Sequence, residues 1–149
     1  MSHILTAKAK IMPDQLDCLR TAATTFGGVM IRKNTYNWYG ARVGNDPMPA
    51  GMRAEELGTC EFAIQVPGIN YEVGVVRSGD HYILAYDFYG SSGRHDGLRL
   101  KQLFGDGLAK LSTEFNMEVV RQTAASNGYI TTESVDAATG EKLLILNQY

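Results

Sequence analysis

Apolar residues occupy every second position in three consecutive segments of the chain, at 60–66, 71–75 and 82–88. Turn-forming sequences rich in Pro, Gly, Asn and Asp separate these segments, at 67–70 and 78–80. Because successive side chains of a strand point to opposite faces, this spacing predicts three strands with one apolar face. The short turns favour an antiparallel meander that buries that face against the rest of the protein.

Two further segments have the spacing of amphipathic helices. The first covers residues 13–26; Pro13 suits the first turn, and Gly27-Gly28 supplies the residue that ends a helix. The second covers residues 106–126, with Asp106 as the expected N-cap. Both apolar stripes are wide enough to pack on a sheet.

The remaining segments with strand character lie around these helices. We expect an opening strand within 3–11, a short buried strand at 29–31, and two final strands at 129–135 and 143–146 joined by a turn at 136–140. The order of elements predicts an α+β fold. Its expected form is ferredoxin-like, a mainly antiparallel sheet with two helices packed on one face.

The size of the chain suits one domain over residues 1–149, with an irregular insert at 32–59 that follows neither period. The net charge is −2, from 14 basic and 16 acidic residues. This balance disfavours a membrane partner and sequence-specific binding of nucleic acid, which use a surplus of Lys and Arg. The two cysteines, and the lack of a secretory signal or an apolar span, indicate a cytoplasmic protein.

Several stretches match a known pattern: the opening Met1-Ser2-His3, and the segments Glu61–Gly74, Tyr82–Asp87 and Asn127–Glu133. In these the chain resembles the family of hypothetical chloroplast reading frame thirty-five, which has members in plastids, cyanobacteria and bacteriophages. The resemblance implies the fold, a cytosolic setting and an accessory role in a phage or bacterium. It implies no activity and no catalytic residue.

The insert combines cationic and aromatic side chains: Arg32, Lys33 and Arg42 alternate with Trp38 and Tyr39. Aromatic planes stack on bases, and guanidinium groups bind phosphates. Trp, Tyr and Arg are equally typical of protein interfaces. The aromatic residues could instead anchor the insert to the body of the protein.

A glycine-rich loop at 90–97 carries Arg94, and Arg99 follows it. Its backbone N–H groups could converge on an anion, although the Gly-Lys-Ser/Thr of a P-loop is missing. The alternative is a surface loop made of turn formers. If this loop and the insert lie at the same end of the sheet, together they would form one site. The expected ligand-binding residues are Arg32, Lys33, Trp38, Tyr39, Arg42, Arg94 and Arg99.

Other chemistry has weaker support. Cys18 and Cys60 fit buried apolar positions, and Glu61 and Glu72 are expected on a solvated strand face. No histidine has the spacing of a metal ligand set, so we expect no metal and no cofactor. The three histidines are His3, His81 and His95.

The leading hypothesis is a non-enzymatic accessory binding protein that captures a small anionic, nucleotide-like ligand or a host partner protein through the Arg/aromatic site. One alternative is a structural or interaction subunit, which a contiguous apolar surface patch would favour. Another is a small hydrolase using His95 and Asp96, which a closed pocket would favour. Exposed strand edges make a homo-oligomer plausible.

Overall fold

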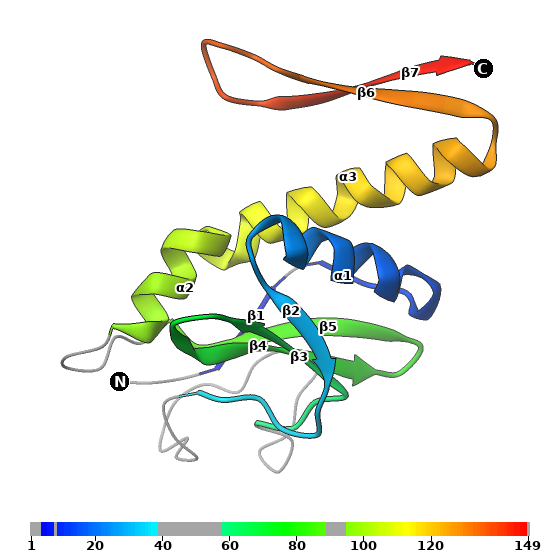
Figure 1. The fold of residues 1–149 in the computed structure, drawn as a ribbon. Helices are drawn as coiled ribbons and strands as arrows, with labels where there is room; N and C mark the ends of the chain where they lie inside the picture. The colour runs from blue at the N-terminus through cyan, green and yellow to red at the C-terminus, as the bar shows by residue number, and fades with distance from the viewer. Residues whose placement is uncertain (1–3, 8, 39–57, 89–94, 149) are drawn as a thin grey trace.

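The computed structural model describes residues 4–7, 9–38, 58–88 and 95–148 (Figure 1). These residues form an antiparallel sheet, a layer of helices on one of its faces and a separate C-terminal hairpin. The strands are β1 (Leu5–Thr6), β2 (Val29–Arg32), β3 (Phe62–Val66), β4 (Ile69–Ser78), β5 (His81–Tyr86), β6 (Tyr129–Val135) and β7 (Lys142–Gln148). The helices are α1 (Leu16–Thr25), α2 (Asp96–Phe104) and α3 (Ala109–Ser126), with 3-10 turns η1 (Pro13–Gln15) and η3 (Asp106–Leu108).

The five-stranded sheet has the order β1-β5-β4-β3-β2, and every neighbouring pair is antiparallel. The predicted meander is confirmed as its centre, β3-β4-β5. Helix α1 carries the chain from β1 at one edge to β2 at the other, and it packs beside α3 on one face of the sheet (Figure 1). The predicted ferredoxin-like α+β arrangement is therefore confirmed.

The main core lies between the sheet and the helices. The fully buried side chains come from the expected apolar faces, such as Leu19 of α1, Ile64 of β3, Leu84 of β5 and Leu111 of α3. Burying one such aliphatic side chain contributes about 1.5–3 kcal/mol relative to leaving it exposed. The helices therefore stay on the sheet.

The opposite face of the sheet is covered as well. Ala63, Gly74 and Ala85 are aligned across three strands and form a row of small residues. The ring of Tyr36, which is buried, lies directly over Gly74. The prediction of a single buried face was incomplete, because the beginning of the insert folds back onto the second face.

The two final strands form their own two-stranded sheet, outside the main sheet. Figure 1 shows this hairpin beyond α3, on the side away from β1–β5. An Asp136 carboxylate that accepts the N–H groups of Ala138 and Thr139 closes its turn, as the sequence predicts. The hairpin thus contacts the protein through α3.

Two predicted boundaries and one predicted N-cap were wrong. Within the described part of the predicted opening strand at 3–11, only Leu5–Thr6 forms a strand, with one further bridge from Ile11 to Tyr82. The predicted helix at 106–126 starts three residues later, because Gly107 and Leu108 have positive φ angles. Asp106 makes no side-chain cap hydrogen bond.

Two other expectations also need correction. The region between the glycine-rich loop and residue 106 contains α2, which was not predicted; Leu100 and Phe104 anchor it in the core. Within the predicted buried strand 29–31, Met30 is buried, but Val29 is exposed at the sheet edge.

Candidate interaction surface

The two faces of the β6–β7 hairpin can be assigned from its register. Residues directly opposite each other in an antiparallel pair point to the same face. The face toward α3 includes Glu133 and Lys142, which reach charged groups of the helix. By alternation, the other face points away from α3. The outward face consists of Ile130, Thr132, Ser134, Leu143, Ile145 and Asn147.

Ion pairs hold the inward face to α3. Lys142 pairs with the buried Glu114, and its ammonium lies 3.4 Å from Glu133. The hydrogen bond to Glu114 raises the pKa of Lys142 above its ordinary value. Arg121 completes the network: it donates to Glu118 at 3.0 Å and to Glu133 at 2.9 Å.

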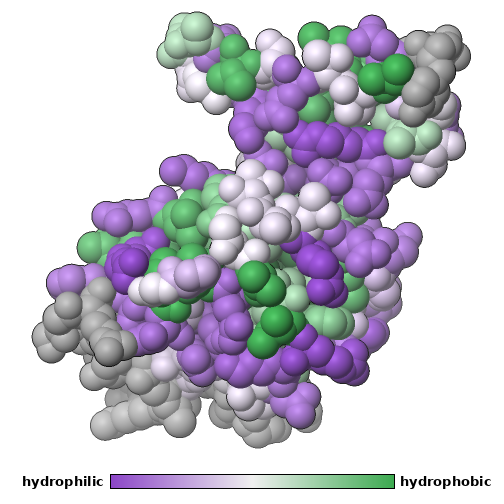
Figure 2. Space-filling model, in the orientation of Figure 1, coloured by the Kyte–Doolittle hydropathy of each residue, from purple (hydrophilic) through white to green (hydrophobic). Residues whose placement is uncertain are grey.

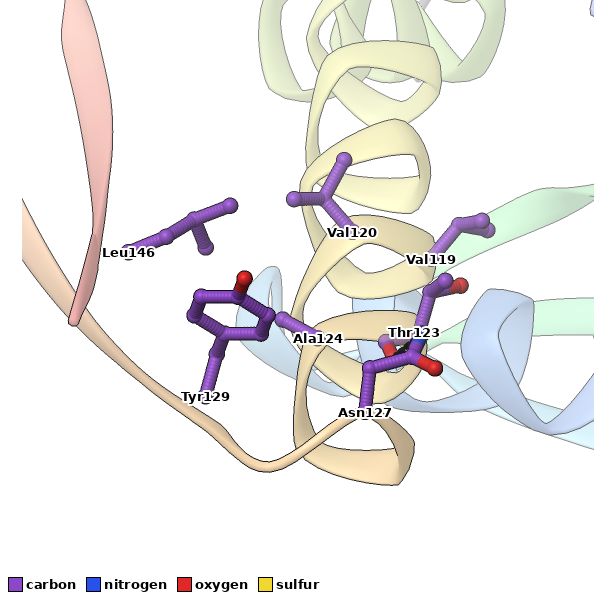
Figure 3. Close-up of a pocket in the computed structure, with 7 residues that line it drawn as sticks. All are labelled: Val119, Val120, Thr123, Ala124, Asn127, Tyr129 and Leu146. Atoms are coloured by element: carbon purple, nitrogen blue, oxygen red, sulfur yellow. Dashed lines mark hydrogen bonds between the residues drawn. The ribbon is translucent and has the colours of Figure 1, made fainter. Parts of the chain in front are cut away.

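An apolar groove remains between the hairpin and the C-terminal half of α3. It has a volume of about 570 Å³. The Tyr129 ring and Leu146 point from the hairpin toward Val120 and Ala124 of the helix (Figure 3). Leu146 and Val120 stay 48% and 42% exposed, so the packing of the hairpin on α3 is incomplete.

The outward face is uncharged, and half of its six residues are aliphatic. Ile130, Leu143 and Ile145 are each about half exposed, at 49%, 54% and 48%. The three other residues of this face are Thr, Ser and Asn, so its six positions carry no charge. Hydrophobic side chains are visible on the projecting hairpin at the top of Figure 2. A hairpin face that meets water is normally polar, so three half-exposed aliphatic side chains make the outward face a candidate interaction surface.

The residues expected to bind an anion are arranged differently from the prediction. Arg32 and Lys33 are neighbours in sequence, and strand alternation sends them to opposite faces of the sheet. The Arg32 guanidinium lies 5.6 Å from the centre of the Phe62 ring on the helix side. The Lys33 ammonium bonds to Glu72 at 2.7 Å on the other side.

Glu72 is the centre of a buried polar cluster, so the prediction that it lies on a solvated face was wrong. It is 2% exposed. Its Oε1 accepts hydrogen bonds from Lys33 and from the Asn37 backbone N–H, and its Oε2 accepts from the Gln65 amide at 2.6 Å. These donors compensate the burial of the carboxylate. The cluster fastens the beginning of the insert to β4.

Trp38 and Arg99 also have internal partners. Trp38 is partly buried, in agreement with the anchoring alternative, and packs against Gly58 and the second core. This second core is the small buried cluster on the face of the sheet away from the helices, made of Ile4, Tyr36, Ala63, Val76 and Ala85. Arg99 of α2 donates a hydrogen bond to the Gly68 carbonyl in the β3–β4 turn. Tyr39, Arg42 and Arg94 lie outside the described residues, and the predicted role of all three stays a prediction.

The two irregular segments do approach the same end of the sheet through their described flanks. The insert reaches β4 through Asn37 and Glu72. The loop before α2 reaches it through Asp96, which is buried and accepts a hydrogen bond from the Asn70 backbone N–H at 3.0 Å. Asn37, Asn70 and Glu72 line a shallow hollow of about 370 Å³. Lys33, the cation next to it, is already paired with Glu72.

The groups considered for catalysis, His95, Asp96 and the two cysteine thiols, do not have the surroundings that catalysis needs. His95 is exposed, and the carboxylate of its neighbour Asp96 accepts a hydrogen bond from the Asn70 backbone N–H. Both observations disfavour the hydrolase alternative. Burial, together with the Glu72 charge, raises the pKa of the Cys60 thiol to about 11. Burial also raises the pKa of Cys18. Neither thiol is poised to ionise near neutral pH.

Glu61 belongs to a surface cluster on the helix side of the sheet. It accepts hydrogen bonds from the Tyr82 hydroxyl at 2.7 Å and from Arg77 at 3.0 Å. These bonds, the one from Tyr82 first, lower the pKa of Glu61. In the described part of the chain, no group of three or more His, Cys, Asp or Glu side chains is placed to hold a metal ion.

Sequence reasoning missed the hairpin surface, although its signal is present in the sequence. Leu143-Leu144-Ile145-Leu146, the predicted last strand, is an unbroken apolar run. Such a run places aliphatic side chains on both faces.

Comparison of the chain with protein-family models, with curated proteins and with solved structures gives no match. Among the described residues, every helix is too short or too polar to cross a lipid bilayer.

Proposed function

We propose that this protein is a non-enzymatic accessory protein that acts by binding another protein chain through the outward face of its C-terminal hairpin. The observation that carries this proposal is the set of three half-exposed aliphatic side chains, Ile130, Leu143 and Ile145, on a face without charge. An isolated two-stranded hairpin is marginally stable in water. A partner on the outward face would complete the burial that α3 provides on the other side.

The form of the attachment supports the same function. The hairpin is held to α3 by ion pairs around Lys142 and Arg121 rather than by a closed apolar core. Because it lies beyond α3, away from the sheet, its outward face is free for contact with a partner (Figure 1). The cytoplasmic setting and the phage or bacterial role remain part of this proposal, and the resemblance of the sequence is their support.

Capture of a small anion through the Arg/aromatic site is the second candidate. The approach of both irregular segments to the β3–β4 turn favours it. The internal partners of Lys33 and Arg99 weigh against it, because an anion would have to compete with Glu72 and with a backbone carbonyl. We therefore place protein binding first.

The test is gentle isolation of the protein from the cells that make it, followed by native mass spectrometry. We expect an assembly heavier than one chain, and we expect Ile145→Lys to release the chain as a monomer. A charge at a half-exposed aliphatic position leaves the fold intact but must be desolvated in any complex that covers it. A single-chain mass for the unmodified protein would overturn the proposal.

A further inference from the structure

Large and small side chains are paired regularly across the outward face of the hairpin. Each of its cross-strand pairs joins one aliphatic residue to one smaller or polar residue. The pairs are Ile130 with Asn147, Thr132 with Ile145, and Ser134 with Leu143. Along β7, Leu143 and Ile145 therefore form a ridge, and Thr132 and Ser134 of β6 form a shallower strip beside it.

The distribution of charge on the hairpin suits contact with an identical chain. In a twofold-symmetric contact residue i of one copy meets residue j of the other, so any charge on the surface needs an opposite charge at the matching position of the same surface. The charged residues within the two strands, Glu133 and Lys142, point to α3 and are paired there. The outward face brings no charge to such a contact, whereas recognition of a charged partner would need complementary charges on it.

This pattern of large and small side chains is also self-complementary. A twofold axis parallel to the strands places β7 of one copy over β6 of the other. The Leu143–Ile145 ridge then fits the Thr132–Ser134 strip of the second copy, and Ile130 meets Asn147. An axis perpendicular to the strands in the same plane would instead bring the two ridges together. The sheets would be about 10 Å apart, the spacing of packed sheets.

We propose that the partner of the outward face is a second copy of this chain, packed face to face about a twofold axis parallel to β6 and β7. This inference rests on the proposed function and names its partner. Two strands of about seven residues offer less area than a standard interface of about 800 Å² per partner. The dimer is accordingly reversible and depends on protein concentration.

Sedimentation equilibrium of the purified full-length protein over a wide concentration range tests the dimer. We expect the average mass to rise from one chain to two. Ile145→Lys weakens the association at least about tenfold, because it places a charge in the apolar contact. The matched control is Leu98→Lys on α2, where the replaced side chain is 45% exposed, close to the 48% of Ile145. This control dimerises like the unmodified chain.

A mixing experiment tests the arrangement itself, because Ile145 is expected to lie over Thr132 of the other copy. Chains carrying Thr132→Glu and chains carrying Ile145→Lys each associate weakly alone, and form a mixed dimer together. Circular dichroism confirms that both variants fold. Equal weakening by Leu98→Lys, or no gain on mixing, overturns the arrangement.

The failure of this inference can be distinguished from failure of the proposed function. If the purified chain stays monomeric while the assembly from cells contains a different protein released by Ile145→Lys, the second copy is refuted and the proposed function stands. If both preparations contain single chains only, both proposals are refuted.

Discussion

Replacement of Gly74 by alanine tests how the insert is attached to the sheet. A Cβ at this position would lie 2.3 Å from Cδ1, 2.6 Å from Cε1 and 2.8 Å from Cγ of Tyr36. Ordinary carbon contacts are about 3.5–4 Å, so the ring must move by more than 1 Å, an estimate from van der Waals radii. Tyr36 is 3% exposed and packs on Ala63 and Ala85, so it has little room to move.

The expected cost follows from these contacts. Overpacking of a core typically costs about 1–3 kcal/mol, and expulsion of a large aromatic side chain costs about 3–5 kcal/mol. We expect Gly74→Ala to lower the free energy of unfolding by about 3 kcal/mol. In a Tyr36→Ala background the clash is absent, and the same change should stabilise the strand by about 0.5–1 kcal/mol, the ordinary gain of alanine over glycine.

Urea denaturation of the four proteins, followed by circular dichroism, gives this double-mutant cycle. The fluorescence of Trp38 adds a local probe, since it is the single tryptophan and packs beside Tyr36 in the second core. Equal effects of Gly74→Ala in both backgrounds would refute the packing of Tyr36 on Gly74.

Three further outcomes are expected. Lys142→Met leaves the buried Glu114 without its ion-pair partner, so we expect the hairpin to detach from α3 more often. Hydrogen exchange of residues 129–148 should then become about tenfold faster, while exchange in the central sheet is unchanged. Alkylation of Cys60 by iodoacetamide in the folded protein is slow at pH 8 and rises as the pH approaches its pKa of about 11; fast labelling at pH 8 would contradict the raised pKa of this partly buried thiol. The lowered pKa of Glu61 means that its stabilising contribution is complete above the ordinary glutamate pKa of about 4.3 and is lost as the pH falls through the folded value. Glu61→Gln therefore lowers stability at pH 7 and makes acid unfolding less steep, and an unchanged acid transition would contradict the Tyr82 and Arg77 contacts.

Local patterns predicted most of the sheet and the first helix. The alternation at 60–66 and Pro13, which begins the 3-10 turn η1 directly before α1, are local signals, and tertiary contacts reinforce them. Helix α2 was missed because the preceding glycines and Ser residues indicate a loop. The i, i+4 pair Leu100 and Phe104, both fully buried, is the signal that could have located it.

The second covered face of the sheet also has a sequence signal. Small residues at the supposedly solvated positions Ala63, Gly74 and Ala85 leave room for another layer. However, the filler, Tyr36, comes from an insert whose path no periodicity predicts. For the same reason Glu72 was expected in solvent: two of its three donors, Lys33 and Asn37, come from the beginning of the insert, and the third is Gln65 of β3.

The candidate site was the least predictable feature. Arg32 and Lys33 look like one cationic group in the sequence, but the alternation of a strand separates them. The hairpin was predicted correctly as two strands and a turn. The position of the hairpin outside the main sheet depends on α3. After Met117 only Ala124 of this helix is buried, so the C-terminal end of α3 extends beyond the core and places the hairpin there.

Hydroxyl-radical footprinting of aliphatic side chains, at low and at high protein concentration, measures directly whether the outward face becomes covered. The account predicts that Ile130, Leu143 and Ile145 are oxidised in dilute protein and become protected together as the concentration rises, while Leu98 reacts equally throughout. If all four side chains react alike at every concentration, and also in the assembly isolated from cells, the hairpin is not a binding surface.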